Sequence, residues 1–355
     1  MSFRDRGRCF ILILLVSLGC AKEQKAPQDV QVQDLASGDH VPADVENEIS
    51  QETCLPAVQG AMPQPDSAPS KFALSMYHFN LQYVAGGMVG MNDMPGYSMN
   101  NEEIEDAIIL ESFEPLLDLL LAHPRWGVDI ELQGLMLDVM MDRHPQVIDK
   151  MRTLAESGQI HVNSFHWSDQ LWIAHPLASM EASDRINRES FARACLPLGK
   201  AVFTQEGQFA EGMGRFLKDD GRVGILPKNL YGYLYEDPPL ALLYDMDGVP
   251  VLLGGQTIVH GHGDDQIETT WHFFDDGEKD LTNDMNPYFG DFFVFSQESA
   301  DAWVARLEAL EADGYHITTV ADYMEHLDRL EVEAQPLPPI VDGTWQAGET
   351  TNTLT

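Results

Sequence analysis

The sequence predicts an α/β domain built from βα units around a mainly parallel sheet. From Lys71 onward, short apolar runs alternate with amphipathic stretches, which is the pattern of such units. Gly158 and Gly314 end two helical patterns and lead directly into apolar runs, as helix C-caps do. With 355 residues, 44% of them apolar, the chain can bury a large core. We therefore expect one (β/α)-barrel domain over residues 70–330.

The apolar runs are short and have the character of buried strands. They cover residues 72–77, 128–132, 159–163, 200–204, 222–226, 249–253, 269–274, 292–295 and 316–320. Helical patterns between them cover residues 104–122, 144–157, 184–196 and 300–312. The strand candidates are more numerous than the roughly eight strands that such a barrel needs. We therefore expect an excursion or a hairpin within residues 249–274.

The N-terminus has the pattern of an export signal. Three arginines at positions 4, 6 and 8 precede an apolar run that ends at Gly19 and Cys20. The run has roughly ten residues, against about 20 for a membrane-spanning helix. A small residue before cysteine resembles a bacterial lipobox, which implies cleavage after Gly19 and lipidation of Cys20. We expect a signal peptide over residues 1–19, a flexible tether over 20–69 and a C-terminal tail over 331–355. The protein is then a lipoprotein held at the periplasmic membrane or the cell surface.

Net charge and cysteine content limit the classes of partner and cofactor that the chain is expected to bind. The formal net charge is −36, from 57 acidic and 21 basic side chains, so nucleic acid and anionic membrane surfaces would repel the chain. Membrane contact is expected only through the lipid anchor. After processing, Cys54 and Cys195 remain, and either they pair in an oxidising compartment or Cys195 is a small core residue. The cysteine spacing is not that of a metal site, and no cofactor is expected.

Polar side chains stand where the predicted strands end. In barrels of this kind ligands meet the loops at the carboxyl ends of strands. Glycoside hydrolysis needs two carboxylates there, one as nucleophile and one as proton donor. The strand-end groups are His78, Asn80, Glu131, Gln133, His166, Asp169, Glu206, Lys228, Asn229, Asp275, Asp276 and Glu278.

Several motifs occur in an order that resembles glycoside hydrolase family 57. Residues 144–164 resemble the family's helix that enters a strand through Gly-Gln. Residues 203–206 resemble its strand end with a nucleophilic glutamate, and residues 271–279 resemble its Asp-Asp-Gly-Glu-Lys motif. Residues 77–80 resemble its first-strand histidine motif, and residues 315–324 its closing strand and helix. The likeness covers about residues 72–327.

The resemblance implies a fold and a chemistry. The fold is a distorted (β/α)7-type barrel, related to that of polysaccharide deacetylases. Glu206 is expected as nucleophile and Asp276 as general acid/base, in a retaining reaction on α-glucan-type bonds. Glu298, near the last strand, is the rival for the acid. The expected sugar contacts are His78, Asn80, His166, Trp167, Asp169 and Asp275.

Departures from the family pattern keep two other functions open. His161 stands where the family often has glutamate, and Gly207 where it has arginine after the nucleophile. A metal-dependent deacetylase would use the Asp275-Asp276 pair with histidines, for which His260 and His262 are the available candidates. A sugar-binding lipoprotein without turnover is the third possibility.

Overall fold

The computed structural model describes residues 58–81, 100–168, 175–204, 217, 221–228, 239–262, 265–282, 294–337, 343–347 and 350–354. The folded unit to which they belong spans Glu52–Thr355. The predicted signal peptide, Cys20 and Cys54 lie outside the described residues. Cys195 is disulfide-bonded.

The larger sheet is mainly parallel and holds the first three strand candidates in sequence order. Its strand order is β3-β2-β1-β9-β8, and β10 also pairs with β1. β8 and β9 form an antiparallel hairpin, which confirms the expected hairpin within residues 249–274. The strands are β1 (Lys71–Phe79), β2 (Val128–Leu132), β3 (Ile160–Asn163), β8 (Ile258–His262), β9 (Asp265–Asp276) and β10 (His316–Ile317).

A second sheet faces the first, with the order β11-β6-β7-β5-β4. The side-chain oxygen Oδ1 of Asn163 in β3 accepts a hydrogen bond from the backbone N–H of Ala201 in β4 at 3.1 Å, which ties the two sheets together. The fold is therefore a mixed α/β arrangement with parallel sheets, as predicted, whereas the ladders of the described strands do not show a closed barrel. The strands are β4 (Ala201–Phe203), β5 (Val223–Pro227), β6 (Tyr244–Met246), β7 (Val249–Gly254) and β11 (Gln335–Pro336). A separate hairpin pairs β12 (Gly343–Ala347) with β13 (Thr350–Leu354).

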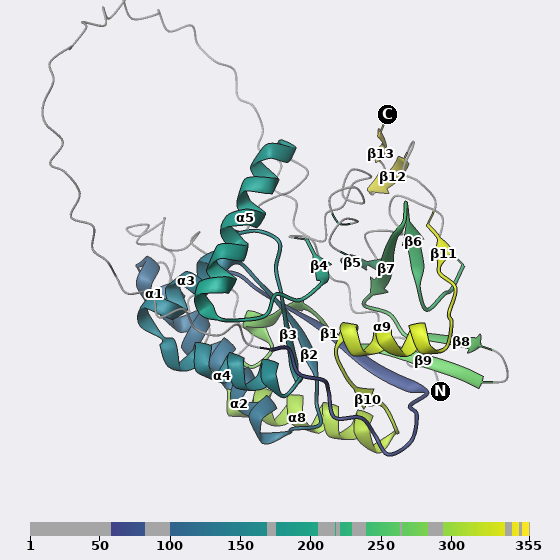
Figure 1. Cartoon of the computed structure of the whole chain (residues 1–355), viewed down its shortest axis with the longest axis horizontal. Helices are drawn as coiled ribbons and strands as arrows, with labels where there is room; N and C mark the ends of the chain where they lie inside the picture. Colours follow the sequence, from purple (N-terminus) through teal and green to yellow (C-terminus); the bar gives the residue numbers. More distant parts are fainter. Residues whose placement is uncertain are drawn as a thin grey trace, which may run out of the picture. The chain divides into compact units, whose positions relative to one another are not determined.

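Helices cover one face of the larger sheet (Figure 1). The helix expected over residues 104–122 is present, but its middle turn is a π-helix. The strand expected over residues 316–320 is shorter, because Thr319 caps a helix that begins at Val320. The helices are α1 (Asn101–Ala107), η2 (Ile108–Phe113), α2 (Glu114–Ala122), α3 (Gly134–Arg143), α4 (Pro145–Glu156), α5 (Leu177–Ala194), η5 (Gly277–Lys279), α8 (Gln297–Ala312) and α9 (Val320–Arg329). In the described part of the chain, no helix is long and apolar enough to span a membrane.

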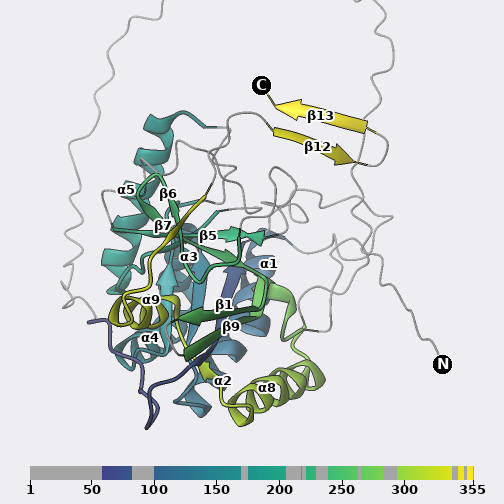
Figure 2. The same ribbon diagram turned by 90° about the vertical axis from the view of Figure 1, so that its right-hand side faces the viewer.

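Side chains of β1 alternate between two cores, as expected for a strand buried on both faces. Tyr77 and Phe79 pack with α1, α2, α3, α4 and α8, whereas Leu74 and Met76 pack against the second sheet. Figure 2 shows the second sheet and the helical layer around β1 and β9 from the side. His78 follows Met76 on the inner face, so it ends a column that is otherwise apolar.

A β-bulge interrupts the pairing of β1 with β9. Leu74 pairs with Trp271 and Ser75 pairs with Phe273, so His272 is the extra residue. Beyond the bulge, His78 pairs with Asp276 and not with Asp275. The bulge therefore decides which of the two consecutive aspartates lies beside His78.

Residues before position 70 belong to the fold. Gly158 has a φ of +78°, which confirms it as a helix cap, and its backbone closely approaches Ala61. The side chain of Gln59 donates to the carbonyls of Ala155 and Ile160, both at 3.1 Å. Met62 is buried. The tether expected through residue 69 is therefore too long, because residues 59–62 dock on α4 and β3.

The expected C-terminal tail also contributes to the fold. Within the tail, β11 adds a parallel strand to β6.

Candidate functional site

Four polar residues form a row across the carboxyl ends of adjacent parallel strands. Asp276 of β9 pairs with His78 of β1, His78 pairs with Glu131 of β2, and Glu131 pairs with Asn163 of β3. Because these strands are parallel and neighbouring, their ends meet at one edge of the sheet. The row lies at the edge where the sequence analysis expected the chemistry.

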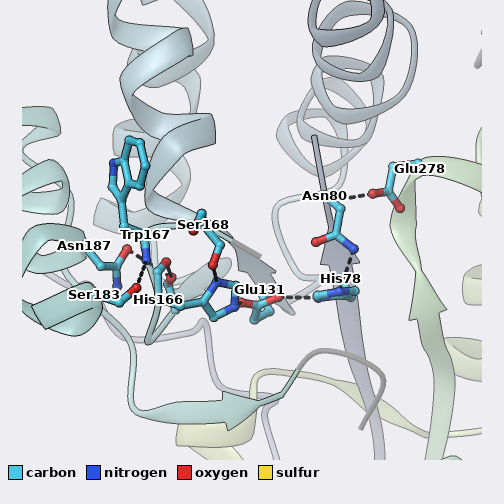
Figure 3. A network of polar contacts seen from close by, with 10 residues as sticks. His78, Asn80, Glu131, His166, Trp167, Ser168, Ser183, Asn187 and Glu278 are labelled. Atoms are coloured by element: carbon cyan, nitrogen blue, oxygen red, sulfur yellow. Dashed lines mark hydrogen bonds and ion pairs between the residues drawn. The ribbon is translucent and has the colours of Figure 1, made fainter. Parts of the chain in front are cut away.

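Glu131 lies between two imidazoles at the centre of this row. One carboxylate oxygen contacts Nδ1 of His78, and the other lies 3.1 Å from Nε2 of His166. The second contact is close but is not aligned as a linear hydrogen bond. All three side chains are buried, with exposed fractions of 3% for His78, 1% for Glu131 and 0% for His166. Figure 3 shows His78 between Glu131 and Asn80.

The two imidazoles keep Glu131 ionised. Burial acts to raise its pKa, but His78 and then His166 outweigh burial through charge and hydrogen bonds, and lower the pKa to about 2. A buried carboxylate is tolerated when it is paired in this way. Glu131 is therefore an anion throughout the neutral range.

Glu278 is a second buried carboxyl on the other side of His78. Its Oε1 accepts a hydrogen bond from the backbone N–H of Asn80, and the Nδ2 of Asn80 lies 2.8 Å from Nε2 of His78. Oε2 of Glu278 has no hydrogen-bond partner among the described residues. Burial, and then the negative charge of Asp276, raise the pKa of Glu278 to about 8. Glu278 therefore carries a proton at neutral pH.

The turn that carries Glu278 is tightly held. A Cβ atom at Gly277 would lie 2.5 Å from the ring of Phe79, so only glycine fits there. The hydroxyl of Ser112 in η2 donates to the carbonyl of Glu278 at 2.9 Å. The position of the protonated carboxyl is thus set by packing against β1 and η2.

Asp276 differs from Glu278 in its surroundings. Its carboxylate forms an ion pair with Lys279 at 2.6 Å, and a third of the side chain is exposed. Of the three carboxyls in the Asp-Asp-Gly-Glu-Lys motif, that of Asp276 is therefore partly open to solvent, and that of Glu278 is closed off.

The loop after β3 is fixed by two helices. Trp167 donates its backbone N–H to Ser183 of α5 at 3.0 Å and its indole N–H to Asp138 of α3 at 2.8 Å. The carbonyl of His166 accepts from the backbone N–H of Gly134 at 3.2 Å. Trp167 is half-buried and is held by both helices, and the backbone of His166 is held by the first residue of α3.

The structure brings together His78, Asn80, Glu131, His166, Asp276 and Glu278. The predicted nucleophile Glu206 and the expected sugar contact Asp169 lie outside the described residues, and the backbone of Asp275 pairs with Tyr77. Glu298, the rival acid, lies exposed in the first turn of α8. Sequence reasoning placed Glu131 and Glu278 at strand ends but gave neither a role; burial of both carboxyls is the signal that the sequence lacks.

The described residues contain no group of three or more His, Cys, Asp or Glu side chains arranged to hold a metal ion. The side chains of His262 and Asp275 are not among those described.

Comparison with known proteins finds similarity in fold alone. No family model and no curated protein matches the sequence. The 4-α-glucanotransferase from Thermococcus litoralis is similar with a TM-score of 0.55 and 15% identity, over 76% of this chain and 42% of that enzyme. A family 57 branching enzyme from Thermococcus kodakaraensis is similar with a TM-score of 0.52 and 12% identity, over 76% of this chain and 73% of that enzyme. The chain thus spans less than half the length of the glucanotransferase. At these identities the chain shares a glycoside hydrolase family 57-like fold.

Proposed function

We propose that this protein is a carbohydrate-active enzyme that cleaves or transfers α-glucan-type glycosidic bonds with retention of configuration. The observation that carries the proposal is the register that sets Asp276, a partly exposed carboxyl, beside His78 at the strand ends, close to the end of β4. Glu278 is the buried, protonated neighbour of this carboxyl and takes neither catalytic role. Glycosidic bond cleavage needs a carboxyl that donates a proton and a carboxylate that stays ionised.

Glu206 is the proposed nucleophile. It follows β4 by three residues, and the ring of Phe203 at the end of β4 packs edge-on against His78 at 5.3 Å. The chain therefore leaves β4 beside the row of polar side chains. In a retaining reaction, the carboxylate of Glu206 attacks the anomeric carbon, and the glycosyl–enzyme bond is later broken by water or an acceptor sugar.

Asp276 is the proposed proton donor and later the base. Its place in register with His78 puts it at the same edge as the end of β4. While Glu278 stays protonated, it adds no second negative charge beside Asp276; an ionised Glu278 would raise the proton affinity of the neighbouring carboxylates. His78, Asn80, His166 and Trp167 are proposed to contact the sugar around these carboxyls, together with Asp169 and Asp275.

The experiment is an assay of the purified protein on α-glucans, with and without EDTA. We expect turnover that EDTA leaves unchanged. Glu206→Ala should lower turnover by several orders of magnitude, and azide should restore part of it and yield a glycosyl azide of inverted configuration. Asp276→Asn should slow substrates with poor leaving groups most, because only these need a proton in the first step.

Matched variants separate the alternatives. Glu298→Gln serves as the control and should leave the rate unchanged; a loss there would transfer the acid role to Glu298. Release of acetate from an acetylated glycan, abolished by EDTA and restored by zinc, would show a deacetylase instead. Glycan binding without turnover, unaffected by Glu206→Gln, would show a sugar-binding protein.

A further inference from the structure

The edges of the two sheets meet at β3 and β4. Among the described strands, β3 and β4 each end a sheet and share no backbone ladder, whereas β4 pairs with β5 on its other side. In this part of the chain, two hydrogen bonds cross from the β4 side to β3. The backbone N–H of Gly199 donates to the carbonyl of Val162 at 2.7 Å, and that of Ala201 donates to Oδ1 of Asn163 at 3.1 Å.

The second of these bonds replaces a bond of a parallel ladder. The bonds of such a ladder are evenly spaced, so the N–H two residues after Gly199 would bond the carbonyl two residues after Val162, which is that of Ser164. The side-chain oxygen of Asn163 takes this bond instead. A Cβ atom at Gly199 would overlap that oxygen, so only glycine fits there. The amide of Asn163 therefore sets the spacing between β3 and β4.

The partners of the Asn163 amide allow one orientation. Nδ2 donates to Oδ1 of Asp129 at 3.0 Å and to the carbonyl of His161 at 3.2 Å. Oδ1 accepts from Ala201, whose backbone N–H only donates. Turning the amide over would set a donor against the N–H of Ala201 and an acceptor against the carbonyl of His161. This orientation therefore holds whatever the charge of Asp129.

Asp129 joins the amide to helix α9. Its second oxygen, Oδ2, accepts from the backbone N–H of Val320, the first residue of α9, at 2.6 Å. Asn163 is fully buried, and the exposed fraction of Asp129 is 1%. A buried network whose members are all hydrogen-bonded makes its surroundings rigid. Two side chains thus connect β2, β3, β4 and α9.

We propose that Asn163 is a positioning residue for the nucleophile: its amide stands in for the missing backbone pairing and sets the direction in which β4 runs towards the row of polar side chains. This inference rests on the proposed function, in which Glu206 follows β4 by three residues. At the end of β4, the ring of Phe203 packs edge-on against His78 at 5.3 Å. A shift of about 1 Å in a reacting group can cost about 100-fold in rate, so the direction of β4 matters for turnover.

Hydrogen exchange of the full chain, measured by mass spectrometry without substrate, tests the structural part. Asn163→Ala removes the acceptor of the Ala201 N–H, so segment 199–203 should exchange about five- to tenfold faster, whereas segment 223–227 of β5 should keep its rate. The matched control is Gln159→Ala. Gln159 precedes β3, and its buried side-chain amide donates to three backbone carbonyls, none of them in β4. Equal exchange of segment 199–203 in the wild-type protein and Asn163→Ala would overturn the proposal.

Turnover on α-glucans tests the functional part. Asn163→Ala should lower kcat by about 10- to 100-fold and leave KM nearly unchanged, because the nucleophile is displaced while the sugar contacts remain. Gln159→Ala should keep the wild-type kcat. A kcat for Asn163→Ala as high as that of Gln159→Ala would refute the positioning role. If the wild-type protein has no turnover, the proposed function fails, and the exchange measurement still decides whether Asn163 holds β4.

A rescue variant separates positioning from a general loss of stability. In Asp129→Asn, the new amide must accept from Val320, so its N–H groups face those of Asn163 and the network is broken. Adding Asn163→Asp restores one carboxyl facing one amide and keeps an oxygen for Ala201. Asp129→Asn should therefore lower kcat and speed exchange of segment 199–203, and the double variant should recover part of both. A double variant no better than Asp129→Asn would overturn the proposal, including where Asn163→Ala does not fold.

Discussion

Replacement of Glu278 by glutamine should remove a large pH dependence of stability. The pKa of Glu278 is raised from 4.5 to about 8 in the folded protein, because the carboxyl is buried and Asp276 lies near it. A raised folded pKa means that the folded state binds the proton more tightly than the unfolded state does. The contribution to stability is therefore complete below about pH 4.5 and is lost as the pH rises to about 8.

The magnitude follows from the shift. The difference between about 8 and 4.5 corresponds to about 5 kcal/mol at 1.36 kcal/mol per unit. Glutamine cannot ionise, and its side-chain carbonyl can still accept the N–H of Asn80. The wild-type protein and Glu278→Gln should thus have similar unfolding free energies at pH 4.5, whereas the variant should be more stable by up to about 5 kcal/mol at pH 9.

Urea unfolding at several pH values between 4.5 and 9 measures this difference. Asp129, whose pKa burial raises to about 7, titrates in the same window but is present in both proteins, so its effect cancels in the comparison. Glu298→Gln, at an exposed position, should run parallel to the wild-type protein. If the difference between wild type and Glu278→Gln is the same at both ends of the range, Glu278 is not the protonated carboxyl inferred here.

Two further predictions concern the helix caps and the N-terminus. Gly158→Ala and Gly314→Ala both force alanine into a positive φ, at +78° and +87°, which costs about 1–2 kcal/mol. Of the two, only Gly158 would place the new Cβ against backbone, 2.4 Å from the carbonyl carbon of Ala61. Urea unfolding should therefore show the larger loss of unfolding free energy for Gly158→Ala. Equal losses for the two variants would mean that residues 59–62 do not dock on α4 and β3. At the N-terminus we propose export and lipidation of Cys20. Labelled palmitate should enter the wild-type protein in a bacterial host and should not enter Cys20→Ala. Equal labelling of the two proteins would contradict the lipoprotein proposal.

The sequence predicted elements well where local chemistry determines them. Gly158 and Gly314 marked helix ends because only a residue without a side chain adopts those backbone angles readily. His78 and Glu131 were found because polar residues that end buried runs stand out. The protonation of Glu278 could not be read in the same way, because it depends on burial, and the turn that carries Glu278 is held by Phe79 and Ser112, which come from distant parts of the chain. The division of the strands into two sheets could not be predicted either, because an apolar run does not determine which neighbouring strand it pairs with.

The extra residue His272 has a consequence for any attempt to align this strand with another by its inside–outside pattern. Before the bulge, odd-numbered residues such as Trp271 pack toward the second sheet, and after it the even-numbered Phe274 does so. An alignment that keeps one phase throughout β9 would interchange Asp275 and Asp276. A one-residue gap belongs opposite His272, and with it Asp276 falls beside His78.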